Sequence, residues 1–203
     1  MPDNILKPNR EYRAFDKFSL LPLKNDNGEA QYRVGGRAVV FDQPSLVGEY
    51  DGVQYFEIID SRAFEGCDMT DVIFNYNHVG KVVARLRNKT LQINIVPGDG
   101  LYMEADLSGT AEGRNLHEEI QGGYIDRMSF SFARNYDYTY DVETHTQTIT
   151  KIKKLYDVSA VDIPAYEETS ISARNSFTEE HEKELRALEQ AQRRKKLIAR
   201  TYL

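Results

Sequence analysis

The strongest constraint on the fold is a regular alternation of apolar and polar residues between positions 91 and 107. Successive side chains of a β-strand point to opposite faces of the sheet, so alternation is typical of a strand with one buried face. The turn-forming sequence Pro97-Gly98-Asp99-Gly100 separates two such runs. The apolar positions are Leu91, Ile93 and Ile95 before the turn and Leu101, Met103, Ala105 and Leu107 after it. The stretch therefore predicts an antiparallel hairpin.

Strand patterns recur along the chain, whereas helical patterns are few. Residues 111–121 are helical in type, and Ser61 can cap a second, short helix. Residues 134–148 suggest an extended hairpin. The other strand candidates are residues 32–41, 53–59, 72–76, 82–86, 128–132 and 149–163. These patterns predict one α+β domain in which strands dominate.

The composition excludes several kinds of function. The 203 residues carry a formal net charge of −6, which gives no electrostatic argument for nucleic-acid binding. A single cysteine, Cys67, cannot form an intramolecular disulfide or a cysteine-rich metal site. The chain has no apolar run of membrane-spanning length, and its N-terminus lacks a signal-peptide core. We therefore expect a soluble, intracellular protein.

Changes in composition divide the chain into three parts. Residues 1–17 are polar and mixed in charge, which suggests a flexible arm, and residues 18–175 contain the apolar segments of a folded domain. Residues 176–203 form a charged helical tail, since opposite charges recur at helical spacing. These pairs are Glu179 with Lys183, Glu182 with Arg186, and Glu189 with Arg193.

Two serines stand on one predicted strand, Met128–Phe132. Ser129 and Ser131 are two positions apart and therefore share one face of it. A hydroxyl on a rigid strand can act as a nucleophile if a general base reaches it. The alternative is a half-buried strand with a polar outer face.

A base and an acid are available elsewhere in the chain. His78 follows a predicted strand and precedes Val79-Gly80, so its ring can lie at a strand end; the alternative is an ordinary loop histidine. Asp157 interrupts an apolar face, and a buried carboxylate needs a partner. An imidazole N–H would serve, as would backbone N–H groups or the lysines Lys153 and Lys154.

Six short stretches, in order within residues 32–170, match blocks of one protein family. They are Gly36–Asp42, Glu57–Ile59 with Ala63-Phe64, Asn77-His78 with Arg85, Gly100–Ala105, Met128–Phe132, and Leu155–Val161 leading into Pro164-Ala165-Tyr166. Together they resemble the prohead (procapsid) maturation proteases of tailed bacteriophages, which look related to the herpesvirus assemblin proteases. Each stretch is short, but their common order makes the resemblance specific.

The resemblance implies a role for each matching residue. His78 matches the family's general base, Ser129 its nucleophile, and Asp157 a position where the family usually has Glu. Ser131 is a departure, because the family usually has Gly there. It stands with Arg85 as an oxyanion or accessory residue.

Two of these implied roles have open alternatives. Arg85 follows Val82-Val83-Ala84 where the family has Leu-Gly before Arg, so a surface arginine is an equal interpretation. The herpesvirus relatives complete the triad with a later histidine. His145 is therefore the alternative to Asp157 as the third member.

The resemblance also implies a fold and a function. The fold would be a mostly antiparallel β-barrel with a few flanking helices, as in the herpesvirus proteases. The function would be a serine endopeptidase that cleaves the scaffolding segment of the major capsid protein, and itself, inside the assembling prohead in the host cytoplasm. No metal or cofactor is required, and no nucleic-acid or membrane partner is implied. The oligomeric state is open, a homo-oligomer included.

Two rival functions remain at this stage. A non-catalytic capsid-assembly or scaffold-like protein on the same fold is favoured by the charged tail. A barrel-type binding module has only the predicted fold in its favour. The presence of His78, Ser129 and Asp157 in one chain favours the enzyme.

Overall fold

The computed structural model of the chain describes residues 7, 9–13, 19–24, 30–50 and 52–162, with helical residues at 182–183, 186–187, 190 and 193. The described residues form thirteen strands and one continuous helix. In chain order they are β1 (Arg10–Arg13), β2 (Ser19–Lys24), β3 (Ala30–Val40), β4 (Ser45–Tyr50), β5 (Val53–Ile59), β6 (Ile73–Tyr76), β7 (Val79–Arg85), β8 (Leu91–Val96), β9 (Gly100–Asp106), α1 (Ala111–Gln121), β10 (Arg127–Ala133), β11 (Asp137–Asp141), β12 (Thr146–Lys151) and β13 (Leu155–Val161).

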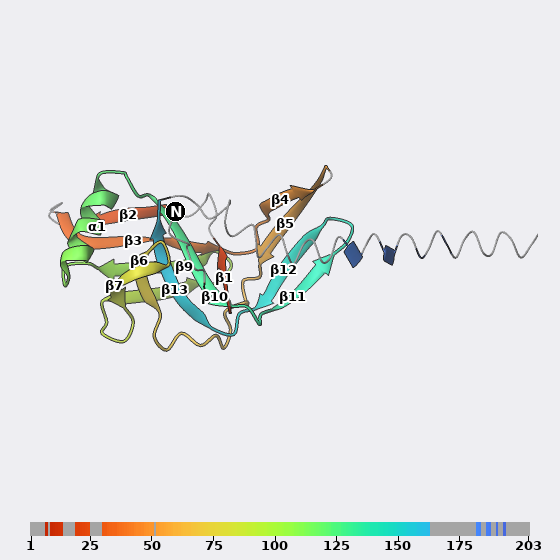
Figure 1. Cartoon of the computed structure of the whole chain (residues 1–203). Helices are drawn as coiled ribbons and strands as arrows, with labels where there is room; N and C mark the ends of the chain where they lie inside the picture. The colour runs from red at the N-terminus through yellow and green to blue at the C-terminus, as the bar shows by residue number, and fades with distance from the viewer. Residues whose placement is uncertain are drawn as a thin grey trace, which may run out of the picture.

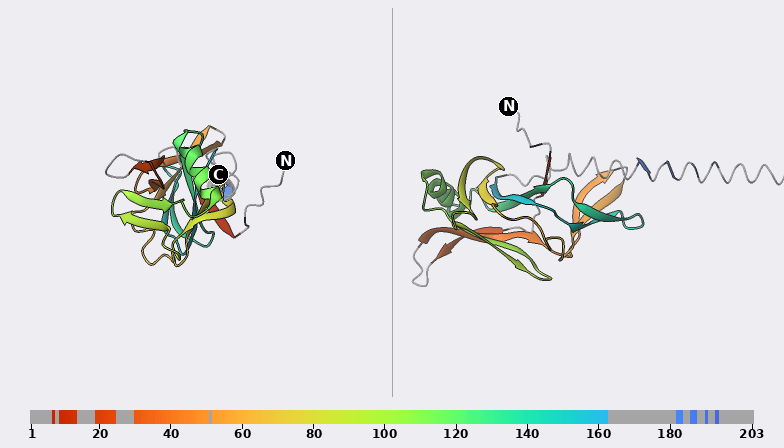
Figure 2. Two further views of the ribbon diagram at one scale, coloured as in Figure 1. Left: turned by 90° about the vertical axis from the view of Figure 1, so that its left-hand side faces the viewer. Right: turned by 90° about the horizontal axis from the view of Figure 1, so that it is seen from below.

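The strands are hydrogen-bonded into three sheets, with the orders β1-β10-β13-β6-β7, β11-β12-β5-β4 and β2-β3-β9-β8. Figure 1 and the right-hand view of Figure 2 place α1 at one end of the molecule and the β4–β5 and β11–β12 ribbons at the other. Most pairings are antiparallel as expected, but β12 pairs with β5 and β13 with β6 in parallel. Within the described residues the strands do not close into one barrel, so closure stays a prediction.

The predicted hairpin at residues 91–107 is confirmed. Strands β8 and β9 pair antiparallel, with Leu91 opposite Ala105 and Val96 opposite Gly100. The alternation works as expected, because Leu91, Leu101, Met103 and Ala105 are buried in the core. The hairpin expected at residues 134–148 is present as β11 and β12.

The core is one continuous cluster, and β10 runs through it. Met128, Phe130 and Phe132 are fully buried on one face of this strand, and the rings of Phe130 and Phe132 stack 5.5 Å apart. Ser129 and Ser131 are also fully buried, although they lie on the opposite face. The prediction of a polar outer face is therefore right in its alternation, but that face is covered, because a polar cluster packs over it.

Two expectations about local structure are wrong. Residues 10–13 were expected within a flexible arm, but they form β1, which pairs antiparallel with β10. Charged residues are buried when they are paired, and Glu11 and Arg13 are both buried in ion pairs. The short helix expected after Ser61 is a series of turns, which leaves α1 as the single continuous helix of the described residues.

Helix α1 begins and ends where its local sequence indicates. The side chain of Thr110 accepts a hydrogen bond from the Gly113 N–H, which caps the first turn, and Gly122 closes the last turn. Leu116 and Ile120 are buried as the spacing predicts. No helix in the described part of the chain is long and apolar enough to cross a membrane.

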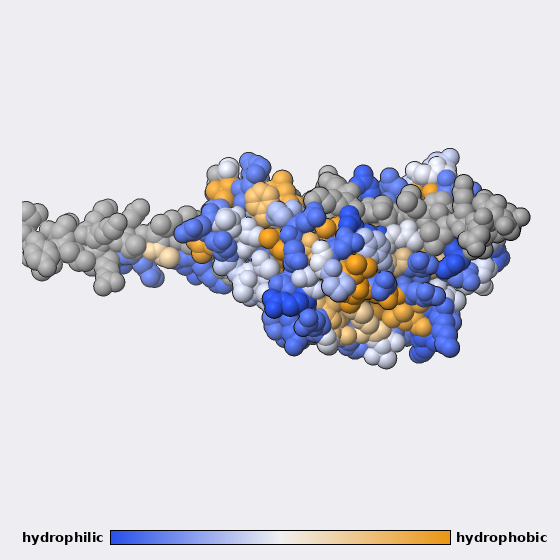
Figure 3. All heavy atoms as spheres, turned by 180° about the vertical axis from the view of Figure 1, so that it is seen from behind, coloured by the Kyte–Doolittle hydropathy of each residue, from blue (hydrophilic) through white to orange (hydrophobic). Residues whose placement is uncertain are grey.

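The molecular surface is mixed in character. Figure 3 shows hydrophobic residues gathered over the middle of one face, with hydrophilic residues toward the two ends. Several large apolar or aromatic side chains are exposed, among them Leu46, Val79, Tyr124 and Val142. Val79 and Tyr124 line one hollow beside α1, whereas Leu46 lies on β4 and Val142 at the turn between β11 and β12.

Candidate active site

Strand pairing brings Ser129 and Asp157 to neighbouring strands. In the antiparallel β10–β13 pair, Ser131 lies opposite Asp157 and Ser129 opposite Ser159. All four side chains are fully buried. Residues directly opposite each other on antiparallel strands present their side chains on the same face, so the hydroxyls of β10 and the carboxylate of β13 share one surface of the sheet.

His78 reaches this surface from the next hairpin. Asn77 and His78 form the two-residue turn between β6 and β7, where Tyr76 pairs with Val79. Both turn residues have positive φ, 49° for Asn77 and 59° for His78. A tight hairpin turn of this kind requires positive φ at both positions, which Asn tolerates better than His. Backbone strain at a residue whose side chain belongs to a polar cluster is typical of a functional position.

The three side chains form one chain of hydrogen bonds. His78 Nε2 lies 2.6 Å from Ser129 Oγ, and His78 Nδ1 lies 2.6 Å from Asp157 Oδ1. With the proton on Nδ1, the ring donates to the carboxylate and its Nε2 can accept the serine proton. The side chain of His78 is only 6% exposed, so water is largely excluded from the contacts. The arrangement contains the parts that serine hydrolases use for acyl transfer.

The Asp157 carboxylate is held by several further groups. Its Oδ2 accepts a hydrogen bond from Ser131 Oγ and forms an ion pair with Arg10 Nη1 at 2.9 Å. Ser159 Oγ lies 3.2 Å from Asp157 Oδ1 and also contacts Asn75 Oδ1, so its one proton serves one of these two acceptors at a time. The carboxylate is thus fully satisfied, as a buried charge must be.

The lysines considered as partners of Asp157 lie elsewhere. Lys153 pairs with Asp137 at 3.0 Å, and Lys154 pairs with Asp68 at 2.6 Å. Sequence reasoning missed Arg10 and Ser159, which contact Asp157, and Asn75, which contacts Ser159. Ser159 carries a usable signal, because it lies two residues from Asp157 on the same strand face. Arg10 carries none, since its partner is 147 residues away.

Strand β1 covers the serine and the histidine. The ring of Tyr12 packs edge-on against His78, with 4.7 Å between the ring centroids. Ser129 Oγ lies 2.9 Å from the carbonyl oxygen of Arg13. A hydroxyl has one proton, so Ser129 can donate either to this carbonyl or to His78 at a given moment. The contact with β1 therefore competes with the hydrogen bond that would activate the serine.

The two remaining candidates are engaged elsewhere. Arg85 Nε donates to Asp71 Oδ1 at 3.0 Å, and a second guanidinium nitrogen contacts the same carboxylate. Hydrogen bonding to Arg85 lowers the pKa of Asp71, so the pair is ionised. His145 lies at the turn between β11 and β12, in a different sheet, with its ring 5.3 Å from that of Tyr55. Neither residue is brought to Ser129 by these contacts.

The comparisons with known proteins agree with the class of enzyme that this geometry indicates. Residues 20–184 match the family described as caudovirus prohead serine protease, so the chain belongs to that family. It is a serine protease of phage prohead maturation, a process that takes place in the assembling capsid.

Among solved structures the chain is similar to the capsid assembly protease gp21 of bacteriophage T4. The TM-score is 0.46 and the identity 12%, over 75% of this chain and 97% of that chain. A likeness at this level adds nothing to the assignment, which rests on the family match. No curated protein matches the sequence.

Proposed function

We propose that Ser129 is the nucleophile of this protease, that His78 is its general base and acid, and that Asp157 orients the imidazole. The observation that supports this most strongly is the unbroken chain of two 2.6 Å contacts from Asp157 through His78 to Ser129. Carboxylate, imidazole and hydroxyl in this order are what acyl transfer by serine requires.

The chemistry follows from these contacts. Ser129 Oγ attacks the carbonyl carbon of the scissile peptide bond while His78 Nε2 takes its proton. Backbone N–H groups stabilise the oxyanion that forms. His78 then gives the proton to the leaving amide nitrogen, the C–N bond breaks, and an acyl-enzyme remains on Ser129. His78 then takes a proton from water, whose oxygen attacks the ester carbonyl, and gives that proton to Ser129 Oγ as the ester bond breaks. Asp157 stabilises the imidazolium at both stages.

The proposed substrates are the scaffolding segment of the major capsid protein and terminal segments of the protease itself, cut inside the prohead in the host cytoplasm. An extended substrate fits the edge of β10, because β1 already lies there as an added antiparallel strand with backbone hydrogen bonds. We expect the wild-type protein to cleave a capsid protein that carries its scaffolding segment, and gel electrophoresis and mass spectrometry would detect the products. If the wild-type protein bound this capsid protein but left it intact, the result would favour the scaffold-like rival.

We also expect self-processing in the tail, residues 176–203. Its described residues include an exposed pair, Arg186 with Glu182, 3.0 Å apart at helical spacing. Exposed pairs of this kind contribute only a few tenths of a kcal/mol, so the helix can open into the extended form that a protease binds. Incubation of purified wild type should release a C-terminal fragment, detected by intact mass.

The control for the tail is Ser129→Ala protein under the same conditions, which should keep its full mass. A tail that remains in both proteins, together with a core that unfolds when residues 176–203 are deleted, would show that this segment belongs to the folded domain.

A further inference from the structure

Arg13 is a buried cation whose backbone contacts the proposed nucleophile directly. Its carbonyl oxygen lies 2.9 Å from Ser129 Oγ, while its guanidinium is buried at the other end of the side chain. A guanidinium is almost never fully buried without a matched acceptor. The surroundings of this side chain therefore form a buried site that accepts a guanidinium, called the Arg13 pocket below.

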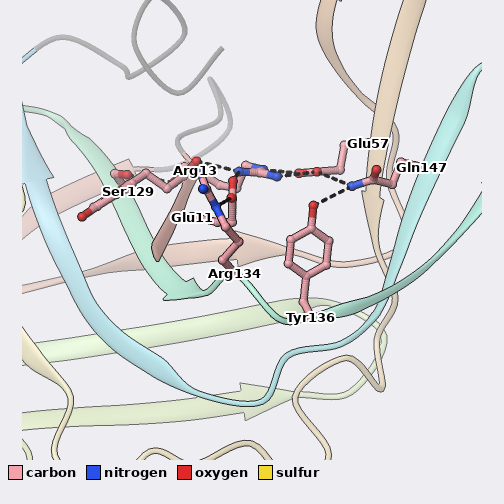
Figure 4. Close-up of polar contacts among 8 residues, drawn as sticks. Glu11, Arg13, Glu57, Ser129, Arg134, Tyr136 and Gln147 are labelled. Atoms are coloured by element: carbon pink, nitrogen blue, oxygen red, sulfur yellow. Dashed lines mark hydrogen bonds and ion pairs between the residues drawn. The ribbon is translucent and has the colours of Figure 1, made fainter. Parts of the chain in front are cut away.

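The groups around the guanidinium are acidic and are linked to one another by hydrogen bonds. Glu57 accepts two parallel hydrogen bonds from Arg13, 2.6 Å from Nε and 2.9 Å from Nη2. Gln147, opposite Glu57 in the parallel β5–β12 pair, donates to the same carboxylate at 3.3 Å and to Tyr136 Oη at 3.1 Å. Figure 4 shows this row of side chains leading away from Ser129. The Phe132 ring lies 5.4 Å from the guanidinium carbon.

The charge balance makes the Arg13 pocket selective for a cation. Burial by itself lowers the pKa of Arg13, but attraction to Glu57 and the hydrogen bonds to it outweigh burial, so the pKa is raised. Glu57 is 1% exposed. Without the guanidinium, Glu57 would be a buried charge that keeps the hydrogen bond from the Gln147 amide but has lost its ion pair, which is strongly unfavourable. A guanidinium satisfies both carboxylate oxygens at once.

Strand β1 places the backbone carbonyl of Arg13 beside the proposed nucleophile, which is where the residue before a scissile bond would lie. Strand β1 runs antiparallel to β10 and ends at Arg13, and its last carbonyl contacts the proposed attacking hydroxyl. The residue two positions earlier, Glu11, is buried and accepts from Arg134 Nε at 2.8 Å. Together these contacts describe an extended segment Glu-x-Arg that is bound through both charged side chains.

The same motif occurs at the other end of the chain. The sequence Glu-Tyr-Arg-Ala at residues 11–14 is matched by Glu-Leu-Arg-Ala at residues 184–187. A further Glu-x-Arg, at residues 112–114, is followed by Asn and lies within α1, a helix held against the core by Leu116 and Ile120. The first site lies at the end of β1 and the second in the charged tail, so both are near the ends of the chain, as expected for sites at which the chain trims itself.

We propose that Glu57 is the primary specificity residue of this protease, that the enzyme cleaves after arginine, and that its own first sites are Arg13–Ala14 and Arg186–Ala187. This rests on the proposed function of Ser129. Attack of Ser129 Oγ on the Arg13 carbonyl carbon breaks the bond to the Ala14 nitrogen, which takes the serine proton through His78. Water then releases residues 1–13 with a free carboxylate at Arg13.

The first test follows self-processing of the full chain by intact mass. Wild type should give products that begin at Ala14 and end at Arg186. Arg13→Gln should lose only the N-terminal cut and keep the C-terminal one. Glu57→Gln should slow both cuts by about 100-fold or more, because a site built around a charged hydrogen bond rejects a partner that it cannot pair. Glu49→Gln, an exposed glutamate on the adjacent β4, is the matched control and should cut as wild type does.

The second test changes the substrate and leaves the enzyme as it is, so that it stands even if a Glu57 variant fails to fold. Peptides containing Glu-Tyr-Arg-Ala are compared with peptides in which citrulline, a neutral isostere, or Glu replaces Arg. We expect kcat/KM to fall on the order of 100-fold or more with citrulline. Equal cleavage of the arginine and citrulline peptides, or self-cleavage after residues other than arginine, would overturn the specificity proposal and leave Ser129 as the nucleophile. No cleavage at all, with wild type and Ser129→Ala alike, would overturn both.

Discussion

Replacing Ser129 with alanine is expected to abolish proteolysis, with a loss of about 10⁶-fold in kcat, the scale found when the nucleophile of a serine protease is removed. The change removes the one atom that forms the covalent bond to the substrate. The fold should persist, because alanine fits the space of a buried serine on β10 whose neighbours are packed in the core. The measurement is the rate of cleavage of a capsid-protein substrate, with circular dichroism to check the fold.

The matched control for this variant is Ser131→Ala, two residues along the same strand. Ser131 donates to Asp157 Oδ2 and does not contact His78 in the hydrogen-bond chain described above. Loss of one hydrogen bond to a charged group costs about 1.5–3 kcal/mol, and Asp157 keeps its bond to His78. We therefore expect Ser131→Ala to keep most of its activity. An inactive Ser131→Ala enzyme beside an active Ser129→Ala enzyme would reverse the assignment of the two serines.

Replacing Asp157 with asparagine should reduce kcat by about 10⁴-fold. The amide keeps the size of the side chain, but its NH₂ group can face Nδ1 and favour the tautomer with the proton on Nε2. That tautomer has no lone pair to accept the Ser129 proton. The loss should appear in kcat, with a smaller change in KM, for a peptide substrate in trans.

The competing assignment of the third role makes a distinct prediction. His145→Ala should leave turnover close to wild type, since His145 lies at the β11–β12 turn in another sheet. If His145→Ala were inactive and Asp157→Asn turned over normally, the third role would belong to His145. Measuring both variants on the same peptide separates the two possibilities.

The part of the site that could be predicted lies on elements with a clear local pattern. The alternation of residues 128–132 predicts that Ser129 and Ser131 share one face, and the period-two stripe after Leu155 shows that Asp157 lies on a buried face. Both placements depend on the geometry of a single strand. The order of the six matching stretches then pointed to His78, and the structure brings all three side chains together.

The contribution of β1 could not be predicted, for a physical reason. Segment 10–13 is rich in charge, and a charged segment is typical of solvated chain unless its partners are known. Its partners are Glu57, Arg134 and Asp157, which are 44 to 147 residues away. No local period reports such pairings. The same holds for Arg85, whose pairing with Asp71 depends on the path of the loop before β6.

Sheet topology was also only partly accessible from the sequence. Neighbouring strands joined by a turn, such as β8 and β9, pair as their local pattern predicts. The parallel pairings of β13 with β6 and of β12 with β5 join segments far apart in the chain. Alternation along one strand states which face is buried but not which strand lies beside it, so these contacts carry no local signal.

The most direct test of the central claim is to identify the side chain that reacts as a nucleophile. A preparation that is turning over a peptide substrate is treated with a fluorophosphonate, which reacts with activated serines, and the modified residue is mapped by mass spectrometry of its peptides. We predict a single label on Ser129, with labelling and loss of activity proceeding at the same rate, and no label on the Ser129→Ala protein. Complete inactivation with the label on Ser131, or with Ser129 unmodified, would contradict the account.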